Sequence, residues 1–86
     1  MAYTYILKCS NDQYYVGSTM DLGKRIKQHQ NVQGCDFTRN HRPVELMYYE
    51  EYDSIDDAYI RERQLHGWSR RKKEALITGK LKQMHK

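Results

Sequence analysis

The chain has 86 residues, of which 30% are charged and 38% hydrophobic, and a net charge of +4. This length suits one small domain, so we expect a single domain over residues 1–86, with a core of about 2–79 and a basic tail at 80–86. No apolar run approaches the roughly 20 residues that a membrane-spanning helix needs, and no signal peptide is visible. We therefore expect a cytoplasmic protein that does not act at a membrane.

Positive charge is concentrated in the last third of the chain. Residues 61–86 hold nine Lys or Arg and two acids, a net charge of +7, whereas residues 1–60 hold six against nine, a net charge of −3. A basic segment of this kind is typical of a surface that contacts phosphate backbones. A Lys-rich last helix is also commonly just a solvated face, so charge alone leaves both interpretations open.

The two cysteines do not indicate a metal–thiolate site. Cys9 alternates with Tyr5 and Leu7 in an apparent strand, where a buried thiol is the ordinary interpretation. Zinc would need about four ligands at short spacing, and Cys35 with His41 is not such a cluster.

The first seventeen residues predict a β-hairpin. Tyr3–Cys9 has a strand pattern, Ser10–Gln13 is a run of turn formers, and Tyr14–Gly17 is β-prone. A helix is expected to begin near Asp21, with Ser18 or Thr19 as its cap. Its spacing places four residues on one side: Leu22, Arg25, Ile26 and His29.

The register of this hairpin decides whether two tyrosines can meet. A three-residue loop, Asn11–Gln13, would set Ser10 opposite Tyr14. Because the loop count is odd, Tyr5 and Tyr15 would then share one face of the sheet.

The second half predicts one strand and two helices. After a polar loop, Val44–Glu50 resembles a third strand. Ser54 can cap a helix that ends at Gly67, and Ser69 can cap another that ends before Gly79. The order β-β-α-β-α-α predicts an α+β fold, a small three-stranded antiparallel sheet flanked by helices.

Glu62 is an unusual residue in the first of these helices, because it lies on a stripe with Ile55, Ala58 and Leu65. Burying an unpaired charge costs several kcal/mol, so Glu62 should have a partner. Spacing leaves three candidates: Arg25, a tyrosine hydroxyl or a divalent cation. Ion pairs are commoner than metal sites, which favours a structural partner.

Arg25, His29 and the tyrosines also have two interpretations each. Arg25 lies on the apolar side of its helix, where it can hold a phosphate in bidentate fashion or cover the core with its stem. Most of the eight tyrosines should be packing residues, although a phenol near a cation can act as a base.

These residues resemble the motifs of the GIY-YIG nucleases. Tyr3-Thr4-Tyr5 and, ten residues on, Tyr15-Val16-Gly17 correspond to the two name-giving motifs, with Tyr3 in place of the glycine. His66 stands where a lysine is frequent among the short bacterial single-domain members, which the chain resembles most. Further matches follow in order: Ser18-Thr19, Arg25, His29, Gly34, Thr38-Arg39, Pro43, Tyr48-Tyr49-Glu50, Ala58, Arg61-Glu62, Trp68-Ser69-Arg70, Lys72-Lys73 and Leu76-Ile77.

The resemblance implies a metal-dependent endonuclease that hydrolyses nucleic-acid phosphodiester bonds and is weak or partner-dependent alone. Glu62 would bind a single Mg²⁺ or Mn²⁺, and Arg25 would stabilise charge on the phosphate oxygens. Tyr5 would deprotonate the attacking water, while Tyr15 would position the water or the phosphate. His29, with a pKa near 6.5, would shuttle a proton or donate a hydrogen bond. We expect these five residues to converge in one shallow concave site.

Nucleic acid is the partner that the resemblance implies, with DNA favoured over RNA and a protein partner as a further source of specificity. Two alternatives stay open: a nucleic-acid-binding module without efficient catalysis, and a protein-interaction role on the same scaffold. The candidate phosphate contacts are Lys24, Lys27, Arg39, Arg70, Arg71, Lys72 and Lys73.

Overall fold

The computed structural model describes residues 1–30 and 42–79. Its strands β1 (Ala2–Lys8), β2 (Tyr14–Thr19) and β3 (Glu45–Tyr52) form an antiparallel sheet in the order β2-β1-β3. Its helices are α1 (Leu22–Gln30), α3 (Ile55–His66) and α4 (Arg70–Ile77). The predicted α+β fold and element order are confirmed. None of the described helices is long and apolar enough to cross a membrane.

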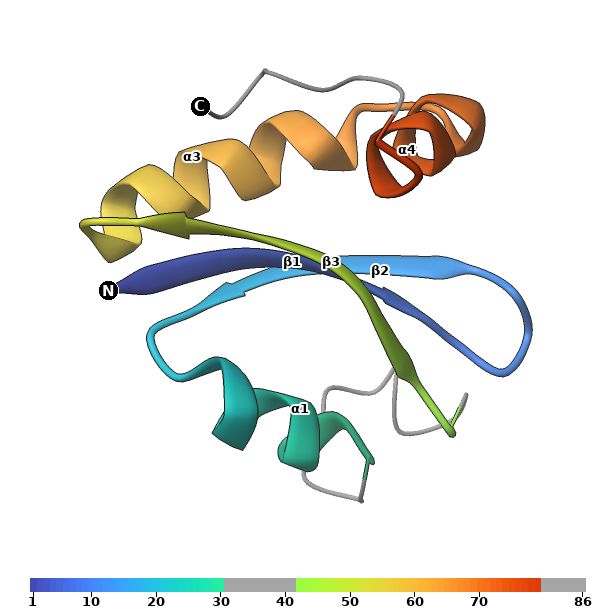
Figure 1. The fold of residues 1–86 in the computed structure, drawn as a ribbon, viewed down its shortest axis with the longest axis horizontal. Helices are drawn as coiled ribbons and strands as arrows, with labels where there is room; N and C mark the ends of the chain where they lie inside the picture. The colour runs from blue at the N-terminus through green and yellow to red at the C-terminus, as the bar shows by residue number, and fades with distance from the viewer. Residues whose placement is uncertain (31–41, 80–86) are drawn as a thin grey trace.

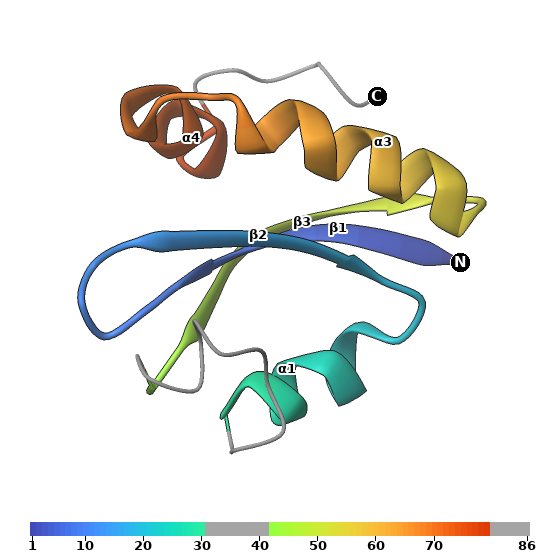
Figure 2. The same ribbon diagram turned by 180° about the vertical axis from the view of Figure 1, so that it is seen from behind.

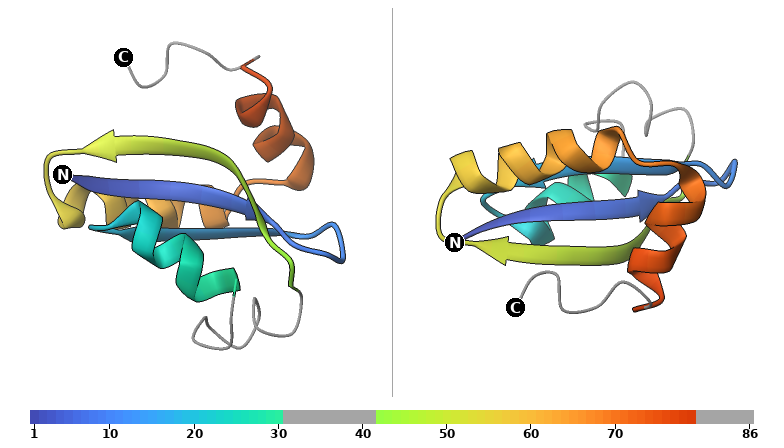
Figure 3. Two further views of the ribbon diagram at one scale, coloured as in Figure 1. Left: turned by 60° about the horizontal axis from the view of Figure 1, so that its bottom comes forward. Right: turned by 90° about the horizontal axis from the view of Figure 1, so that it is seen from above.

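The helices cover both faces of the sheet. Figure 1 shows α1 on one face and α3 with α4 on the other, and Figure 2 shows the same layers from behind. In Figure 3, α3 runs along the sheet and α4 turns across its hairpin end. Strand side chains alternate between the faces, so β1 contributes to two small cores. The core under α1 contains Tyr5, Leu7, Cys9 and Val44, and the core under α3 and α4 contains Ile6, Val16, Leu65 and Leu76.

The hairpin register differs from the predicted one. Lys8 lies opposite Tyr14, so Ser10 does not. The Cys9 amide donates to the Gln13 carbonyl at 2.9 Å, and the loop is therefore residues 10–12. Asp12 takes a left-handed conformation (φ 70°), as the last residue of three-residue hairpin loops commonly does. The loop count is still odd, so the predicted sharing of one face by Tyr5 and Tyr15 is confirmed.

The cap of α1 was assigned to the wrong residue. The Lys24 amide donates to Asp21 Oδ1 at 3.1 Å, which makes Asp21 the capping side chain. Ser18 and Thr19 belong to β2, which extends two residues beyond the predicted strand. The caps of the later helices are confirmed, since Ser54 accepts from the Asp57 amide and Ser69 from the Lys72 amide, both at 3.2 Å.

An irregularity in β3 sets which of its residues face which core. Ile6 pairs with Tyr48, but Leu7 pairs with Leu46, so Met47 is an extra residue in β3. Leu46 thereby joins the core under α1, while Tyr48 lies on the α3 side. Glu50, two residues beyond Tyr48, also lies on that side.

Candidate active site

Tyr5 and Gly17 form the floor of a cluster on the α1 face. They lie opposite each other in β1 and β2, and a Cβ atom at Gly17 would lie 2.5 Å from the Tyr5 hydroxyl. The tyrosine ring therefore occupies the space that any larger residue would need. The Tyr5 side chain is only 1% exposed, and its hydroxyl lies 3.0 Å from His29 Nε2.

His29 is fully buried at the end of α1. Burial, followed by the nearby positive charge of Arg25, lowers its pKa from 6.5 to about 4. The imidazole is therefore neutral at pH 7. The expectation of a pKa near 6.5 was wrong, because the sequence showed the helical position of His29 but not how completely the sheet would cover it.

Tyr15 and Arg25 complete this cluster. The Tyr15 ring centroid lies 5.1 Å from that of His29, and Tyr15 remains partly exposed. Arg25 is also partly exposed, and its Nη1 donates to Gln28 Oε1 at 2.9 Å. The structure thus brings Tyr5, Tyr15, Arg25 and His29 together on one side of β2.

Glu62 lies on the other side of the sheet, on α3. The Ser18 hydroxyl of β2 donates to Glu62 Oε1 at 2.6 Å, and His66 Nε2 lies 3.2 Å from Oε2. The expected pairing with Arg25 or a tyrosine hydroxyl was therefore wrong. Glu62 does point towards the hairpin, as expected, and its side chain is 19% exposed.

β2 separates the five predicted residues into two groups, with Glu62 on the α3 face and the other four on the α1 face. β2 is an edge strand, with α1 below and α3 above it (Figure 2). Two surface depressions follow this side of the molecule. One is lined by Tyr14, Tyr15, Val16, His66 and Lys73, and the other by Tyr59, Glu62, Arg63 and His66. His66 is common to both, so the candidate site continues around the strand edge.

A family model described as the GIY-YIG catalytic domain matches residues 1–75. The chain belongs to the GIY-YIG family. The predicted site residues all lie within the matched range: Tyr5, Tyr15, Arg25, His29 and Glu62.

Named relatives of this GIY-YIG chain are UPF0213 proteins. It is 42% identical over 76 residues to UPF0213 protein SSP2268 of Staphylococcus saprophyticus, covering 88% of this chain and 93% of that protein. It is 41% identical over 80 residues to UPF0213 protein CPE1444 of Clostridium perfringens, covering 93% and 86%. The solution NMR structure of UPF0213 protein BH0048 from Bacillus halodurans matches with a TM-score of 0.58 and 37% identity, covering 91% and 84% of the two chains.

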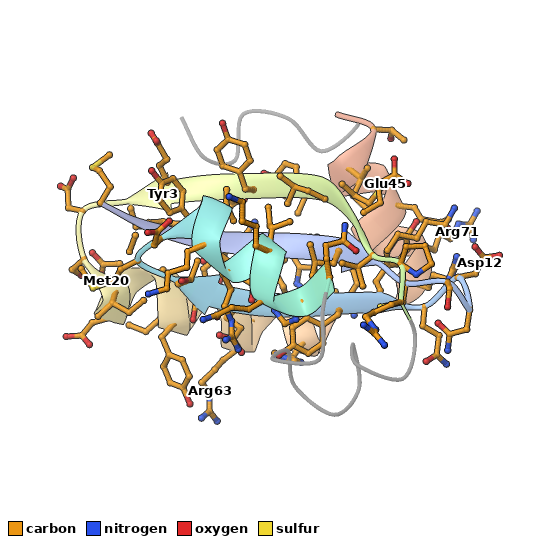
Figure 4. The ribbon with its side chains drawn as sticks, turned by 90° about the horizontal axis from the view of Figure 1, so that it is seen from below. Tyr3, Asp12, Met20, Glu45, Arg63 and Arg71 are labelled. Carbon is orange, nitrogen blue, oxygen red and sulfur yellow. The ribbon has the colours of Figure 1, made fainter. Side chains whose placement is uncertain are left out.

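The basic residues of this GIY-YIG domain have unequal surroundings. Arg70 donates to Glu74 Oε2 at 3.1 Å and to the Asp12 carbonyl, and its guanidinium lies 4.6 Å from the Tyr14 ring. Arg70 therefore fastens α4 to the hairpin. Figure 4 shows Arg71 at the same end of the sheet as Asp12.

The remaining candidate phosphate contacts are lysines, apart from Arg39, which lies outside the described residues. The Lys72 amine lies 4.3 Å from the Trp68 ring, whereas Lys73 is partly buried and faces β2 residues. Lys24 and Lys27 are exposed on α1. The basic segment is thus partly structural and partly available to a ligand.

The donor set of the GIY-YIG site fits a weakly coordinated divalent cation. Within residues 1–30 and 42–79, no three His, Cys, Asp or Glu side chains group closely enough to enclose a metal ion. Mg²⁺ is commonly held by one or two carboxylates, with waters in its remaining positions. Glu62 has two partners against about four lone-pair sites on a carboxylate, so it can serve as such a ligand.

Sequence reasoning missed the partners of Glu62 and a second buried carboxylate. Ser18 was interpreted as a cap, although its parity with Val16 places it on the α3 face. His66 was recognisable only as the i+4 neighbour of Glu62. Glu50 is 3% exposed and bound by Arg61, and nothing in the strand pattern named that partner.

Proposed function

We propose that this domain is a metal-dependent endonuclease that hydrolyses nucleic-acid phosphodiester bonds inside the cell, with DNA favoured over RNA, and that it is weak or partner-dependent alone. One observation carries the proposal: Glu62 keeps unused oxygen lone pairs beside the outer edge of β2, which pairs with no other strand within residues 1–30 and 42–79. The same strand carries Tyr15. A carboxylate in this position can hold a cation that also contacts a phosphate at the strand edge.

A single Mg²⁺ or Mn²⁺ held by Glu62 would neutralise a phosphate oxygen and the leaving group. Ser18 would keep the carboxylate in one orientation, because its hydroxyl already donates to Oε1 at 2.6 Å. His66 contacts the second oxygen and would limit how that oxygen moves.

Arg25 would stabilise the negative charge that develops on the phosphate oxygens. It projects from the side of α1 that also holds His29, and it is partly withdrawn from water. A guanidinium presents a planar pair of donors that matches two phosphate oxygens. The positive charge of Arg25 helps to lower the pKa of His29, which supports a position of the guanidinium close to the tyrosines.

Burial leads us to assign the water-facing role to Tyr15 rather than Tyr5. The Tyr5 hydroxyl is enclosed and lies 3.0 Å from His29, so an attacking water would not readily reach it. Tyr15 lines a surface depression and is partly exposed. A phenol there can receive or order the proton of a water.

His29 and Tyr5 would position Tyr15. A neutral imidazole next to the Tyr5 hydroxyl and packed 5.1 Å from the Tyr15 ring restricts where that ring can lie. We therefore propose no proton shuttle through His29 at neutral pH. Its contribution would be the geometry of the phenol at the strand edge.

A nucleic-acid-binding module without efficient catalysis is the second candidate function. The separation of Glu62 from Tyr5 and Arg25 by β2 favours it, because catalysis requires closely positioned groups. Binding alone requires only the exposed basic residues.

The test is nicking of supercoiled plasmid DNA by the full chain, with and without Mg²⁺ or Mn²⁺. Glu62→Ala and Arg25→Ala should each remove metal-dependent nicking, whereas Glu51→Ala, an exposed acid on the opposite edge strand, should leave it unchanged. Nicking that survives Glu62→Ala would overturn the proposed metal ligand. Salt-dependent DNA binding without any nicking would support the binding module instead.

A further inference from the structure

The depression between β2 and α4 connects the two halves of the candidate site. It has a volume of about 270 Å³ and is lined by Tyr14, Tyr15, Val16, His66 and Lys73. Tyr15 packs against His29 on one side of the strand, and His66 contacts Glu62 on the other. A ligand in this depression would therefore lie next to both sets of proposed active-site residues.

The charge along this part of the strand suits an anion. The depression contains no acidic side chain, and neither does its neighbour, which shares Tyr14 and Lys73 and adds Gln13 and Arg70. Other depressions do contain acids: one includes Asp57, and another includes Asp21 and Glu51. The surface from the hairpin to His66 thus offers cations to a polyanion. Two carboxylates border it: Glu74, which accepts from Tyr14 and Arg70, and Glu62, which contacts His66.

Lys73 is the cation best placed to bind within the depression. Among the described residues its side-chain amine forms no ion pair and no hydrogen bond, whereas Arg70 is bound to Glu74 and Lys72 lies over Trp68. Burial lowers the pKa of Lys73, because the surrounding side chains remove part of the water that would solvate the ammonium. A phosphate oxygen would replace that lost solvation with a charge-assisted hydrogen bond.

The rest of the lining suits a flat aromatic group. Tyr14 and Tyr15, which lie on opposite faces of the edge strand β2 and both line the depression, supply apolar surface. The volume of about 270 Å³ is just below the range of roughly 300–1,000 Å³ that is usual for drug-sized ligands. A single nucleotide matches this size. Within a duplex the base edges are paired and the faces stacked, so only an unpaired nucleotide can place its base here without added cost.

We propose that this depression binds one unpaired nucleotide that flanks the scissile phosphate, with its base against the tyrosine side chains and its phosphate at Lys73. This inference rests on the endonuclease function proposed above, because only a nuclease has a phosphate that it cuts. The inference adds a substrate class to that function: nucleic acid that is single-stranded, frayed or branched where it is cut.

The first experiment is an NMR titration of the full ¹⁵N-labelled chain with the thymidine dinucleotide TpT, without divalent metal. Amide shifts should concentrate at residues 14–16 and at Lys73. Lys73→Gln should weaken Kd at least about fivefold through loss of a charge-assisted contact. Lys73→Arg should retain most of the affinity. Arg42→Gln, which removes one positive charge at an exposed position outside the depression, should weaken it by no more than about twofold.

The second experiment compares a single-stranded oligonucleotide with a blunt hairpin duplex of equal length by fluorescence anisotropy. The wild type should prefer the single strand, and Lys73→Gln should reduce that preference. Equal losses in the Arg42→Gln and Lys73→Gln variants, or shifts confined to the outer face of α4, would overturn the inference. Because neither assay contains metal, such a failure is independent of nicking, and an absence of nicking would leave this binding result intact.

Discussion

Two carboxylates in this molecule, Glu50 and Glu62, have opposite surroundings. Glu50 on β3 accepts from Arg61 at 3.0 and 3.2 Å and from the Tyr48 and Tyr52 hydroxyls at 2.7 and 2.6 Å. Glu62 on α3 has only the Ser18 hydroxyl and His66 as partners among the described residues. The first carboxylate is saturated with donors, whereas the second retains capacity for a ligand.

The difference shows how adjacent residues of one helix, α3, can have separate roles: one stabilises the fold and the other is the proposed metal ligand. Arg61 reaches the β3 side of the sheet and Glu62 the β2 side, and Figure 4 shows Arg63 extending past the β2 edge. Burial tends to raise the pKa of Glu50, but the hydrogen bonds from Arg61 and the two tyrosines outweigh it and the net effect is a lowered pKa. Glu50 is therefore held as an ion that no further ligand can reach.

The largest expected effect is on folding, from Arg61→Met. This change removes the cation and leaves the Glu50 charge buried, which should lower the free energy of unfolding by about 3–5 kcal/mol. Urea denaturation followed by circular dichroism measures it. Arg63→Met, which alters an exposed arginine on the same helix, should change stability by less than about 0.5 kcal/mol. A loss below about 1 kcal/mol for Arg61→Met would show that the tyrosine donors alone support Glu50.

The second prediction makes the same substitution at each carboxylate and compares its effects on cleavage and on stability. Glu62→Gln should reduce metal-dependent cleavage about 100- to 1,000-fold, a typical loss when a charge-stabilising group is removed, with little change in stability. Glu50→Gln should do the reverse, lowering stability by about 1–3 kcal/mol while the folded protein retains its cleavage rate. Single-turnover nicking and urea denaturation, run on both variants, distinguish the two. Parallel losses of activity and stability in both would contradict the comparison.

The third prediction uses pH to separate the buried groups. The pKa of His29 falls from 6.5 to about 4 on folding, so the unfolded chain takes up this proton first as pH decreases. The free energy of unfolding therefore has its full value, as far as His29 is concerned, above pH 6.5. It decreases progressively as the pH falls from 6.5 to 4, by up to about 3 kcal/mol. Glu50 also contributes to the free energy of unfolding, because its charged form is stabilised in the folded protein and its carboxyl pKa is lowered. This contribution is lost only below about pH 4.5.

Unfolding free energies measured from pH 7.5 to 3.5 check this separation. His29→Gln should flatten the slope between pH 6.5 and 4.5 and leave the decline at lower pH in place. An unchanged slope in this variant would mean that another group takes up the proton.

The smallest expected effect comes from Ser18→Ala, which removes the hydroxyl that orients Glu62. Loss of this hydrogen bond should cost about 1 kcal/mol of stability. The apparent affinity for Mg²⁺ in the nicking assay should fall about tenfold, as is usual when a group that orients a metal ligand is removed. Ser18→Thr keeps a hydroxyl at the same position and should recover most of that affinity. Identical behaviour of the two variants would argue against an orienting role.

Local sequence pattern accounts for most of the fold. Ser54 and Ser69 were identified as caps because a capping side chain precedes a helical stripe by a fixed spacing. The shared face of Tyr5 and Tyr15 was predictable because strand parity depends only on whether the loop count is odd. The register itself was not, since it depends on the backbone conformation of the loop, including the left-handed Asp12.

Tertiary pairing explains what sequence could not supply about the site. The odd position of Glu62 was visible in the helical stripe, but its partner Ser18 depends on which face of β2 the helix α3 covers. The neutral state of His29 depends on complete burial under the sheet, and helical spacing carries no information about that. The donors around Glu50 come from two elements, one of which is displaced by the irregularity at Met47.

The open edge of β2 has a consequence for the architecture of larger proteins built from this module. A fourth strand added there would cover the depression that lies between Tyr15 and Glu62. Gene fusions that extend the sheet on that side should therefore abolish the proposed nuclease activity while preserving the fold. Within residues 1–30 and 42–79, the β3 edge carries none of the proposed site residues, so extra domains can join there. The module should therefore accept partners along β3 and resist any that pair with β2.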